Sequence, residues 1–336
     1  MPSPSINMYK SLKLYLIVSF FLLGGCYGEN SSPKLSSNCP SITHENGETA
    51  ICQTPKQVVA LSPYVLDLLL SLNIQPDGFS SANIFRGRIF DNPTSQIPYI
   101  GKYLTSQLIN TGDRHNPSLE TLILLKPDVI IGEYWQGNDK YPLLSQIAPT
   151  ILVNEEKGGW RRDLMTVAKI FNQETKAQEV IKVRDNNILS AREQLSSIVT
   201  THPRILLLST GSIVDGFYDY GTQPTIYSHI IEGIGFEIVN LKESNHNINE
   251  KISLEAIPNI DTDIIIVIAW DREDKTNLDR WKIRQREWAN NPILSNLEVF
   301  KQGKVYFLDA HLTMVRGALA EDIILLEMIS LLEKNK

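Results

Sequence analysis

The side chains best suited to ligand binding in this sequence are arginines and large aromatic residues in loops that follow predicted strands. Ligands of parallel sheets bind outside the carboxyl ends of the strands, so these loops can share one site. Arginine binds carboxylates through two parallel hydrogen bonds, and aromatic rings cover the apolar parts of a ligand. The candidate ligand-binding residues are Arg86, Arg88, Tyr103, Trp135, Tyr218, Trp270, Arg272 and Arg316.

Each candidate also has a simpler structural interpretation. A loop arginine can be a solvated surface charge or the partner of a nearby aspartate, and Trp135 and Trp270 can pack their loops onto the core. Arg86 and Arg316 are the strongest candidates for ligand contact. His311 lies in one of the same loops, where it can donate to a ligand or simply lie at the surface.

The sequence favours neither a metal centre nor an enzyme. Its six histidines are scattered, without the pairs or clusters that hold soft metal ions. It contains no Gly-x-Ser-x-Gly, no phosphate-binding loop and no His-Glu-x-x-His. We therefore expect a binding protein without catalytic residues or resident cofactor, and an exported hydrolase or redox enzyme is the remote alternative.

Composition supports a globular protein. The chain has 336 residues, 42% of them hydrophobic, which suits one large or two medium domains. Its net charge of −6 and the lack of a basic run argue against nucleic-acid binding.

The N-terminus has the features of an export signal. Lys10 and Lys13 precede the apolar run 14–23, which is short for a stable membrane span. The sequence Leu-Gly-Gly-Cys that ends this region resembles a bacterial lipobox, which implies cleavage before Cys26 and a lipid on that cysteine. We predict a lipoprotein signal peptide over residues 1–25 and a flexible polar tether over 26–38.

Two further cysteines flank a predicted hairpin. Asn46-Gly47 lies midway between Cys39 and Cys52, and Asn-Gly between short strands is a strong hairpin signal. A hairpin brings the two cysteines together, and disulfides persist in exported proteins. We therefore predict a Cys39–Cys52 disulfide.

The rest of the chain alternates predicted strands and helices, which is typical of layered α/β structure. Short strands are predicted at 57–61, 97–101, 128–131 and 150–153, and again at 204–209, 237–240 and 305–308. The segment 252–268 contains a further buried strand that begins at Asp263. Between these groups, residues 174–199 contain no Pro or Gly and carry apolar residues at helical spacing. This long helix either connects two lobes or is an ordinary surface helix.

A partial repeat favours two lobes. Ser118-Leu119-Glu120 aligns without gaps on Ser253-Leu254-Glu255, and Asp128 then falls on Asp263 ahead of a buried strand. Chance similarity between leucine-rich segments is the alternative. We predict an N-terminal α/β lobe over 39–172, a connecting helix over 173–200 and a C-terminal α/β lobe over 201–336.

Several stretches together resemble the substrate-binding proteins of ABC importers for ferric siderophores, haem and vitamin B12. The similarity is greatest to the ferric-dicitrate and hydroxamate-siderophore group and extends over about residues 55–332. It rests on the order and spacing of segments 64–72, 117–132, 149–152, 252–268 and 303–317. The resemblance implies two similar α/β lobes joined by a single long backbone helix, with the ligand cleft between them.

The resemblance also implies partners and further residues. The cargo would be a ferric siderophore or ferric citrate, so that iron arrives already chelated, and haem or vitamin B12 is the alternative cargo. One acidic residue on each lobe, Glu120 and Glu255, would dock onto the importer permease, which works with its ATPase. A plainer reading places each carboxylate in the first turn of a short helix, where it favours the helix dipole. We expect a monomer, periplasmic or on the cell surface, anchored through lipid on Cys26.

Overall fold

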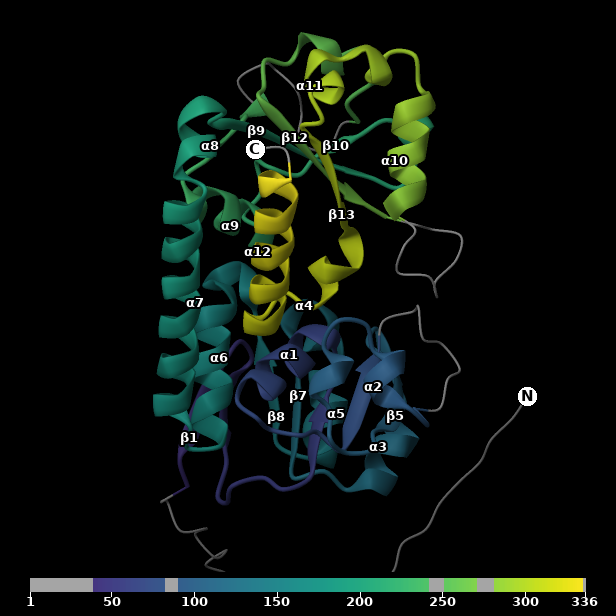
Figure 1. The fold of residues 1–336 in the computed structure, drawn as a ribbon. Coiled ribbons are helices and arrows are strands. Elements are labelled where there is room, and N and C mark those ends of the chain that lie inside the picture. The colour runs from purple at the N-terminus through teal and green to yellow at the C-terminus, as the bar shows by residue number, and fades with distance from the viewer. Residues whose placement is uncertain (1–38, 82–89, 242–250, 271–280, 335–336) are drawn as a thin grey trace, which may run out of the picture. The chain divides into compact units, whose positions relative to one another are not determined.

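The computed structural model describes residues 39–81, 90–241, 251–270 and 281–334. Residues Cys39–Lys336 form one compact unit, which has an α/β fold with two mixed sheets and a separate β-hairpin (Figure 1). None of the helices among the described residues has the length and apolar character to cross a membrane. The predicted signal peptide, tether and lipidation site at Cys26 lie outside the described residues.

The first sheet has the strand order β6-β5-β4-β3-β7-β8. All neighbouring strands run parallel except β5 and β6. The strands are β3 (Val58–Ala60), β4 (Gly78–Ser81), β5 (Ile109–Asp113), β6 (Asn116–Pro117), β7 (Val129–Glu133) and β8 (Thr150–Val153). The helices connecting or following them are α1 (Pro63–Ser71), α2 (Pro93–Gln96), α3 (Leu119–Leu125), α4 (Tyr134–Gly137), α5 (Tyr141–Ile147) and α6 (Gly159–Ile170).

The second sheet has the order β10-β9-β12-β13, with β11 also paired to β9. Only β10 runs antiparallel to its neighbour. The strands are β9 (Arg204–Thr210), β10 (Tyr218–Asp219), β11 (Glu237–Ile238), β12 (Ile264–Ala269) and β13 (Val305–Asp309). The helices of this region are α8 (Ser196–Thr201), α9 (Ile226–Ile234), α10 (Trp281–Asn290), α11 (Glu298–Lys301) and α12 (Ala318–Glu333).

The two aligned aspartates have equivalent places in the two sheets. Asp128 accepts hydrogen bonds from the backbone N–H groups of Lys56 and Gln57, at 2.8 and 2.9 Å, just before β3. Asp263 accepts from the backbone N–H of Arg204 at 2.9 Å, at the start of β9. Each carboxylate therefore ties the start of its own strand to the start of the neighbouring strand. The segments before them differ, because Glu120 lies in α3 whereas Glu255 lies in a turn ahead of the 3-10 helix Ile257–Asn259.

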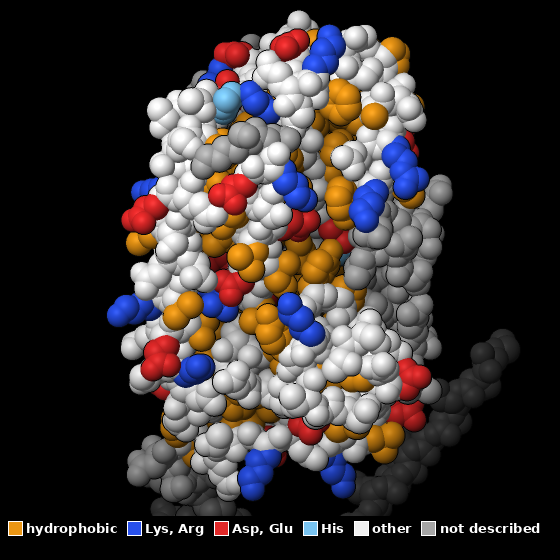
Figure 2. All heavy atoms as spheres, in the orientation of Figure 1, with side chains coloured by type: hydrophobic (Ala, Val, Ile, Leu, Met, Phe, Trp, Pro, Cys, Tyr) orange, Lys and Arg blue, Asp and Glu red, His pale blue; other side chains and the backbone are white. Residues whose placement is uncertain are grey.

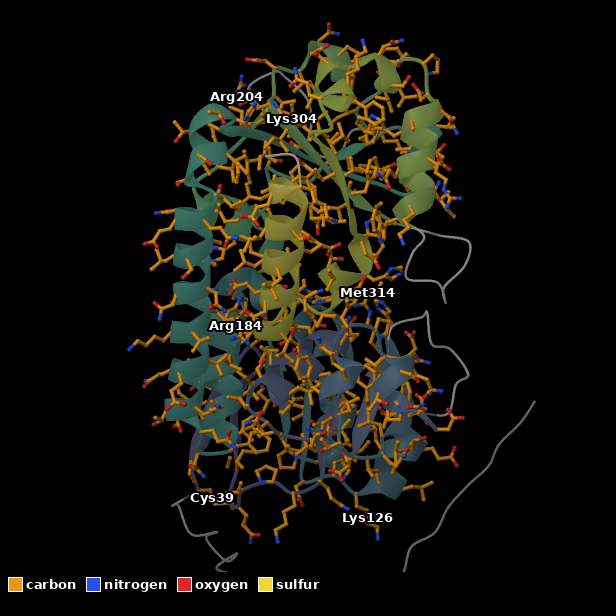
Figure 3. The ribbon with its side chains drawn as sticks, viewed as in Figure 1. Cys39, Lys126, Arg184, Arg204, Lys304 and Met314 are labelled. Carbon is orange, nitrogen blue, oxygen red and sulfur yellow. A yellow bond between two sulfur atoms is a disulfide. The ribbon has the colours of Figure 1, made fainter. Side chains whose placement is uncertain are left out.

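The predicted long helix is present as two helices. α7 (Glu174–Gln194) ends with Leu195 as its C-cap residue, and α8 follows at once. The hydroxyl of Ser196 donates to the carbonyl of Glu193 at 2.8 Å, and a serine that bonds the backbone in this way competes with helix continuation. α7 packs against α6, α9 and α12 (Figure 1). Arg184 of α7 extends toward α12 (Figure 3), where it donates to the carbonyl of Ala318 and pairs with Asp322, both at 2.9 Å.

The predicted strand over 97–101 is wrong. Ile97 and Ile100 are buried, but they flank a turn in which Tyr99 has a φ of +64°. Pro98 supplies no N–H for a ladder, and its carbonyl accepts from Ile100 at 2.7 Å. The chain then forms the 3-10 helix Gly101–Tyr103, and the strand of this region is β5, which the sequence pattern did not indicate.

Helix α1 is buried on every side and binds the N-terminus of α12. Ser62 caps the N-terminus of α1, since the Ser62 side chain accepts from the N–H of Val65 at 3.2 Å. Asp67 accepts from the backbone N–H groups of Leu319 and Ala320 at 3.0 and 2.9 Å. Burial outweighs these hydrogen bonds and raises the pKa of Asp67 to about 7. A β-carbon on Gly317 would lie 2.4 Å from Cγ of Asp67, so only glycine allows this close approach.

Glu327 on α12 predicts an unusual pH dependence of stability. Burial, with a further effect from the charge of Asp309, raises the pKa of Glu327 from 4.5 to about 7. Because the folded-state pKa is the higher one, the associated stability is complete below about pH 4.5 and is lost as the pH rises through 7. Glu327→Gln should raise the unfolding free energy at pH 8 by about 1–2 kcal/mol, a value discounted for partial exposure, and change it little at pH 4.5.

Urea unfolding at the two pH values measures this effect. Glu232→Gln, on the exposed side of α9, is the matched control and should behave like the wild type at both. An equal stability change for Glu327→Gln at both pH values would contradict the prediction.

Strands β1 (Ser41–His44) and β2 (Gly47–Ala50) form the predicted hairpin. Its turn residues are Glu45 and Asn46, and Gly47 has a φ of +115°, a conformation that favours glycine. A disulfide joins Cys39 and Cys52, as the sequence predicts. Together, hairpin and disulfide form a closed unit that packs against β8 and α6.

Candidate functional site

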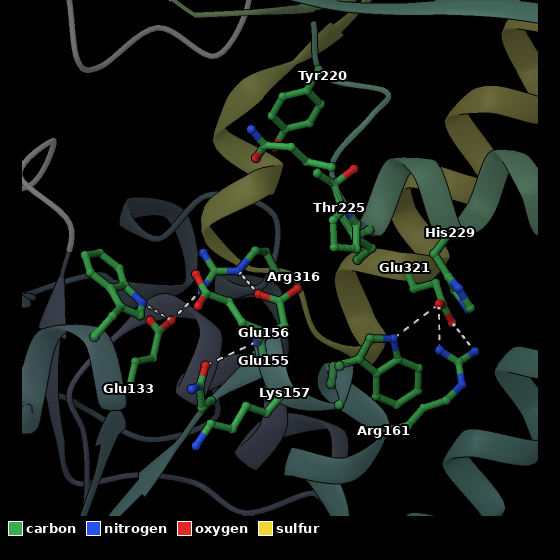
Figure 4. A pocket seen from close by; sticks show the side chains of 18 residues that line it. Glu133, Glu155, Glu156, Lys157, Arg161, Tyr220, Thr225, His229, Arg316 and Glu321 are labelled. Carbon is green, nitrogen blue, oxygen red and sulfur yellow. Dashed lines mark hydrogen bonds and ion pairs between the residues drawn. The ribbon is translucent and has the colours of Figure 1, made fainter. Parts of the chain in front are cut away.

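A cavity of about 780 Å³ opens at the carboxyl ends of β7 and β8 (Figure 4). One wall comes from Glu133 and Trp135, from the loop 154–159 and from the start of α6. The opposite wall comes from Tyr220, from residues 223–226 and His229 at the start of α9, and from Arg316 and Glu321 next to and within α12. The site therefore follows the carboxyl-end rule on the side of the first sheet.

Arg316 belongs to the opposite wall and pairs with two residues of the first wall. Its guanidinium pairs with Glu133 and with Glu155, and its Nη1 donates to the carbonyl of Thr313 at 2.9 Å. The guanidinium also packs over the ring of Tyr64, 5.1 Å from the ring centre. Burial disfavours the charge, but Glu133 and Glu155 outweigh burial and raise the pKa of Arg316. Arg316 therefore remains charged.

The backbone at Arg316 is held in an uncommon conformation. Its φ of +53° lies in the left-handed region, which costs a non-glycine residue of the order of 1 kcal/mol or more. The two ion pairs on one side and the fixed start of α12 on the other maintain this conformation. The side chain is thus pre-positioned.

Glu133 supplies an unpaired acceptor. Its Oε2 accepts from the indole of Trp135 at 2.9 Å and pairs with Arg316. Its Oε1 is buried and has no hydrogen-bond partner among the described residues. A buried acceptor of this kind is costly unless water or a ligand donates to it.

The other cations of the cavity are also paired. Arg161 donates to Glu321 at 3.1 Å and to Asp185 at 2.6 Å, and it packs over the ring of Trp160. Lys157 pairs with Glu45 at 2.5 Å. The described lining residues include four glutamates against these three cations, so the cavity has no excess of positive charge among the residues described.

The N-terminus of α6 adds a partial positive charge to the cavity. No side chain caps this helix, whose N-cap position is Gly158, and both Gly158 and Gly159 line the cavity. Free N–H groups and the helix dipole at such an end favour an anion.

Of the eight predicted ligand-binding residues, Trp135 and Arg316 line the cavity. Arg86, Arg88 and Arg272 lie outside the described residues. Tyr103, Tyr218 and Trp270 are described and do not line it. Tyr103 accepts from Gln75 through its carbonyl, Tyr218 lies below the ammonium of Lys251, and Trp270 stacks edge-on against His311.

His311 is held by its neighbours. Its Nδ1 lies 2.7 Å from Oδ1 of Asp309, and the same carboxylate accepts from Tyr99, which lies in the turn ahead of the 3-10 helix Gly101–Tyr103. Glu120 and Glu255 are both exposed, away from the cavity lining. No group of three or more His, Cys, Asp or Glu residues in the described part of the chain is arranged to hold a metal ion.

Several lining residues were missed in the sequence. The loop 154–159 directly follows the strand at 150–153, so the carboxyl-end rule could have identified it. Arg161, His229 and Glu321 lie on helices and gave no comparable signal, because only tertiary packing brings them to the cavity.

Arg114 was also not predicted as a site residue. It lies beside the cavity wall with its guanidinium over the ring of Trp135, and its buried Nε has no partner among the described residues.

The chain belongs to the periplasmic binding protein family, whose model matches residues 58–312. Proteins of this family bind substrates without transforming them, so the chain is a binding protein and not an enzyme.

The chain is also similar to individual proteins of known name or structure. The chain is 29% identical to the Fe(3+)-citrate-binding protein YfmC of Bacillus subtilis, over 90% of each chain. It is 24% identical to the probable siderophore-binding lipoprotein YfiY of the same organism, over 89% of this chain and 90% of that one. The crystal structure of Staphylococcus aureus SirA complexed with staphyloferrin B matches with a TM-score of 0.69 at 23% identity, covering 88% of this chain and 98% of SirA. At 23% identity, this match shows that the two proteins share a fold.

Proposed function

We propose that the chain is the lipid-anchored substrate-binding protein of an ABC importer and that it captures a ferric complex of the citrate or hydroxamate-siderophore type. The observation that carries this proposal is the cavity of about 780 Å³, which is within the usual range for small-molecule sites. A charged arginine, an uncapped helix N-terminus and the rings of Trp135, Trp160 and Tyr220 meet there. This combination suits a partly anionic, partly apolar chelate. The similarity to iron-binding relatives agrees with it.

Fluorescence titration of the mature protein tests the proposal. Trp135 and Trp160 line the cavity, so a saturable change in tryptophan emission is expected with ferric citrate or with a ferric trihydroxamate. Trp135→Phe should remove much of that change. Saturable binding of haem or cobalamin but of no ferric chelate would instead support the alternative cargo, and no response to any of them would refute the proposal.

We further propose that residues 39–172 and 201–336 act as two lobes and that α7 is the helix connecting them. In support, α7 packs against α6 from the first region and against α9 and α12 from the second. The bonds from Arg184 to α12 add polar contacts along the same side. A continuous helix resists bending more than a loop does, so opening and closing of the cavity would be small.

Glu120 and Glu255 are our proposed docking residues for the importer permease and its ATPase complex. Both carboxylates are exposed, and they occupy aligned positions in the two halves of the sequence. Replacing both by lysine should abolish iron uptake in cells and leave chelate affinity of the purified protein unchanged, because neither lines the cavity. Glu298→Lys, another glutamate on the second region, is a suitable single-site control. Normal uptake by the double variant would refute the docking role.

We also propose export of the chain and lipidation at Cys26, with attachment to a membrane. Nucleic acid is not an expected partner. On the face in Figure 2, acidic and basic side chains are interspersed, whereas nucleic-acid binding uses a continuous basic surface.

A further inference from the structure

The disulfide-closed hairpin β1–β2 covers the edge of the first sheet next to the cavity. β8 is the last strand of that sheet, and its Leu152 carbonyl accepts from the N–H of Glu45 at 3.2 Å. The Leu152 N–H in turn donates to Nδ1 of His44 at 3.4 Å. The hairpin turn is therefore fixed beside the point where β8 gives way to the loop 154–159 that lines the cavity.

The turn contains a buried carboxylate that reaches this loop. The side chain of Glu45 is only 4% exposed, and it pairs with Lys157 at 2.5 Å and with Arg162. Burial opposes the charge of Glu45, but the hydrogen bonds from Lys157 and Arg162 outweigh burial and lower the pKa of Glu45. Of the two cations, Lys157 lines the cavity and Arg162 does not.

Lys157 is the cavity cation most able to change its partner. Its side chain is 61% exposed, whereas that of Arg316 is 19% exposed and fixed by Glu133 and Glu155. The partner of Lys157 does not line the cavity, so the carboxylate cancels the lysine charge without facing the ligand.

We propose that Glu45 determines the charge selectivity of the cavity, by holding Lys157 and cancelling a positive charge that would otherwise favour more anionic chelates. This inference rests on the proposed function. It assigns the hairpin a role in ligand discrimination, because the hairpin supplies the neutralising charge. Arg162 stays paired with Glu45 when Lys157 turns away, so the hairpin itself need not move.

Glu45→Gln tests the inference through the ratio of two affinities. Ferric dicitrate is the anionic probe and a ferric trihydroxamate of the ferrichrome type is the neutral one, both titrated by tryptophan fluorescence. The variant should shift the ratio toward ferric dicitrate by about five-fold, because the released Lys157 can turn its ammonium toward the cavity and bring a unit charge to roughly 8 Å from the chelate in partly solvated protein. Glu48→Gln, which removes an exposed carboxylate from the same hairpin, should leave the ratio unchanged.

Lys157→Met provides the second variant. Alone, it should shift the ratio toward the neutral probe, and in its presence the effect of Glu45→Gln should shrink by more than half. Because Lys157 is largely exposed, this variant is expected to fold even if Glu45→Gln does not.

Three results would overturn the inference. An equal loss of affinity for both probes in Glu45→Gln would indicate a purely structural role. An undiminished effect of Glu45→Gln in the Lys157→Met background would place the charge effect elsewhere. A wild-type protein that binds neither probe would refute the proposed function and the inference with it.

Discussion

Replacing Arg316 by alanine should lower the affinity for the ferric chelate at least ten-fold and reduce the free energy of unfolding by about 3–5 kcal/mol. The stability loss is expected because Glu133 and Glu155 would be left as buried or partly buried charges without their shared cation. The affinity loss is expected because a guanidinium has five N–H donors, of which Glu133, Glu155 and the Thr313 carbonyl use three. The remaining donors can meet the oxygen atoms of a ligand.

The two effects of Arg316→Ala can be separated. Adding Glu133→Gln removes one of the stranded charges and should restore part of the stability, measured by urea unfolding, without restoring chelate affinity. Arg286→Ala, an exposed arginine on α10, should affect neither quantity. If Arg316→Ala were destabilised but bound chelate normally, Arg316 would be a structural residue and the site assignment would be wrong.

Gly317→Ala should destabilise the protein by about 3 kcal/mol, at the upper end of the usual cost of overpacking. The new β-carbon would lie 2.4 Å from both Cγ and Oδ1 of Asp67 and 2.9 Å from its Cβ. Asp67 is fully buried, and its carboxylate is held by Leu319 and Ala320, so it cannot move aside freely. The start of α12 must therefore shift, and the neighbouring Arg316 with it. We expect weaker chelate binding as well.

A double-mutant cycle checks this mechanism. In an Asp67→Ala background, two of the three clashing atoms are absent, so the additional cost of Gly317→Ala should fall by at least half. Additive costs would show that the clash with Asp67 is not the cause. Thermal or urea unfolding of the four proteins is sufficient.

The sequence predicted the features that depend on local pattern. Buried strands such as 128–131 and 204–209 have continuous apolar runs, and Asn46-Gly47 is a strong hairpin signal. The aligned aspartates were informative because Asp128 and Asp263 make the same kind of bond in their sheets. The apolar spacing over 174–199 did not reveal the break at Leu195. Ser196 disturbs the helix through a hydrogen bond from its side chain to the backbone, and such a bond leaves the spacing of apolar residues unchanged.

The site was less predictable than the fold. Trp135 and Arg316 were found because they follow strands, whereas Trp270 also follows a strand and packs against His311 instead. Tyr103 was chosen because of the predicted strand over 97–101, which is not present. The rule that ligands bind at the carboxyl ends of parallel strands identifies the correct loops, but it does not say which of their side chains enter the cavity. Glu45 could not have been anticipated, because its partners Lys157 and Arg162 lie more than a hundred positions further along the chain.

The hairpin has a consequence for handling the protein. The edge strand β8 would present unpaired backbone groups if the turn at Glu45 detached, and exposed strand edges recruit further chains into intermolecular sheets. In a reducing compartment the cysteines would not hold the hairpin closed. Material produced in a bacterial cytosol is thus expected to aggregate more readily than exported material, with chelate binding impaired only in the reduced fraction.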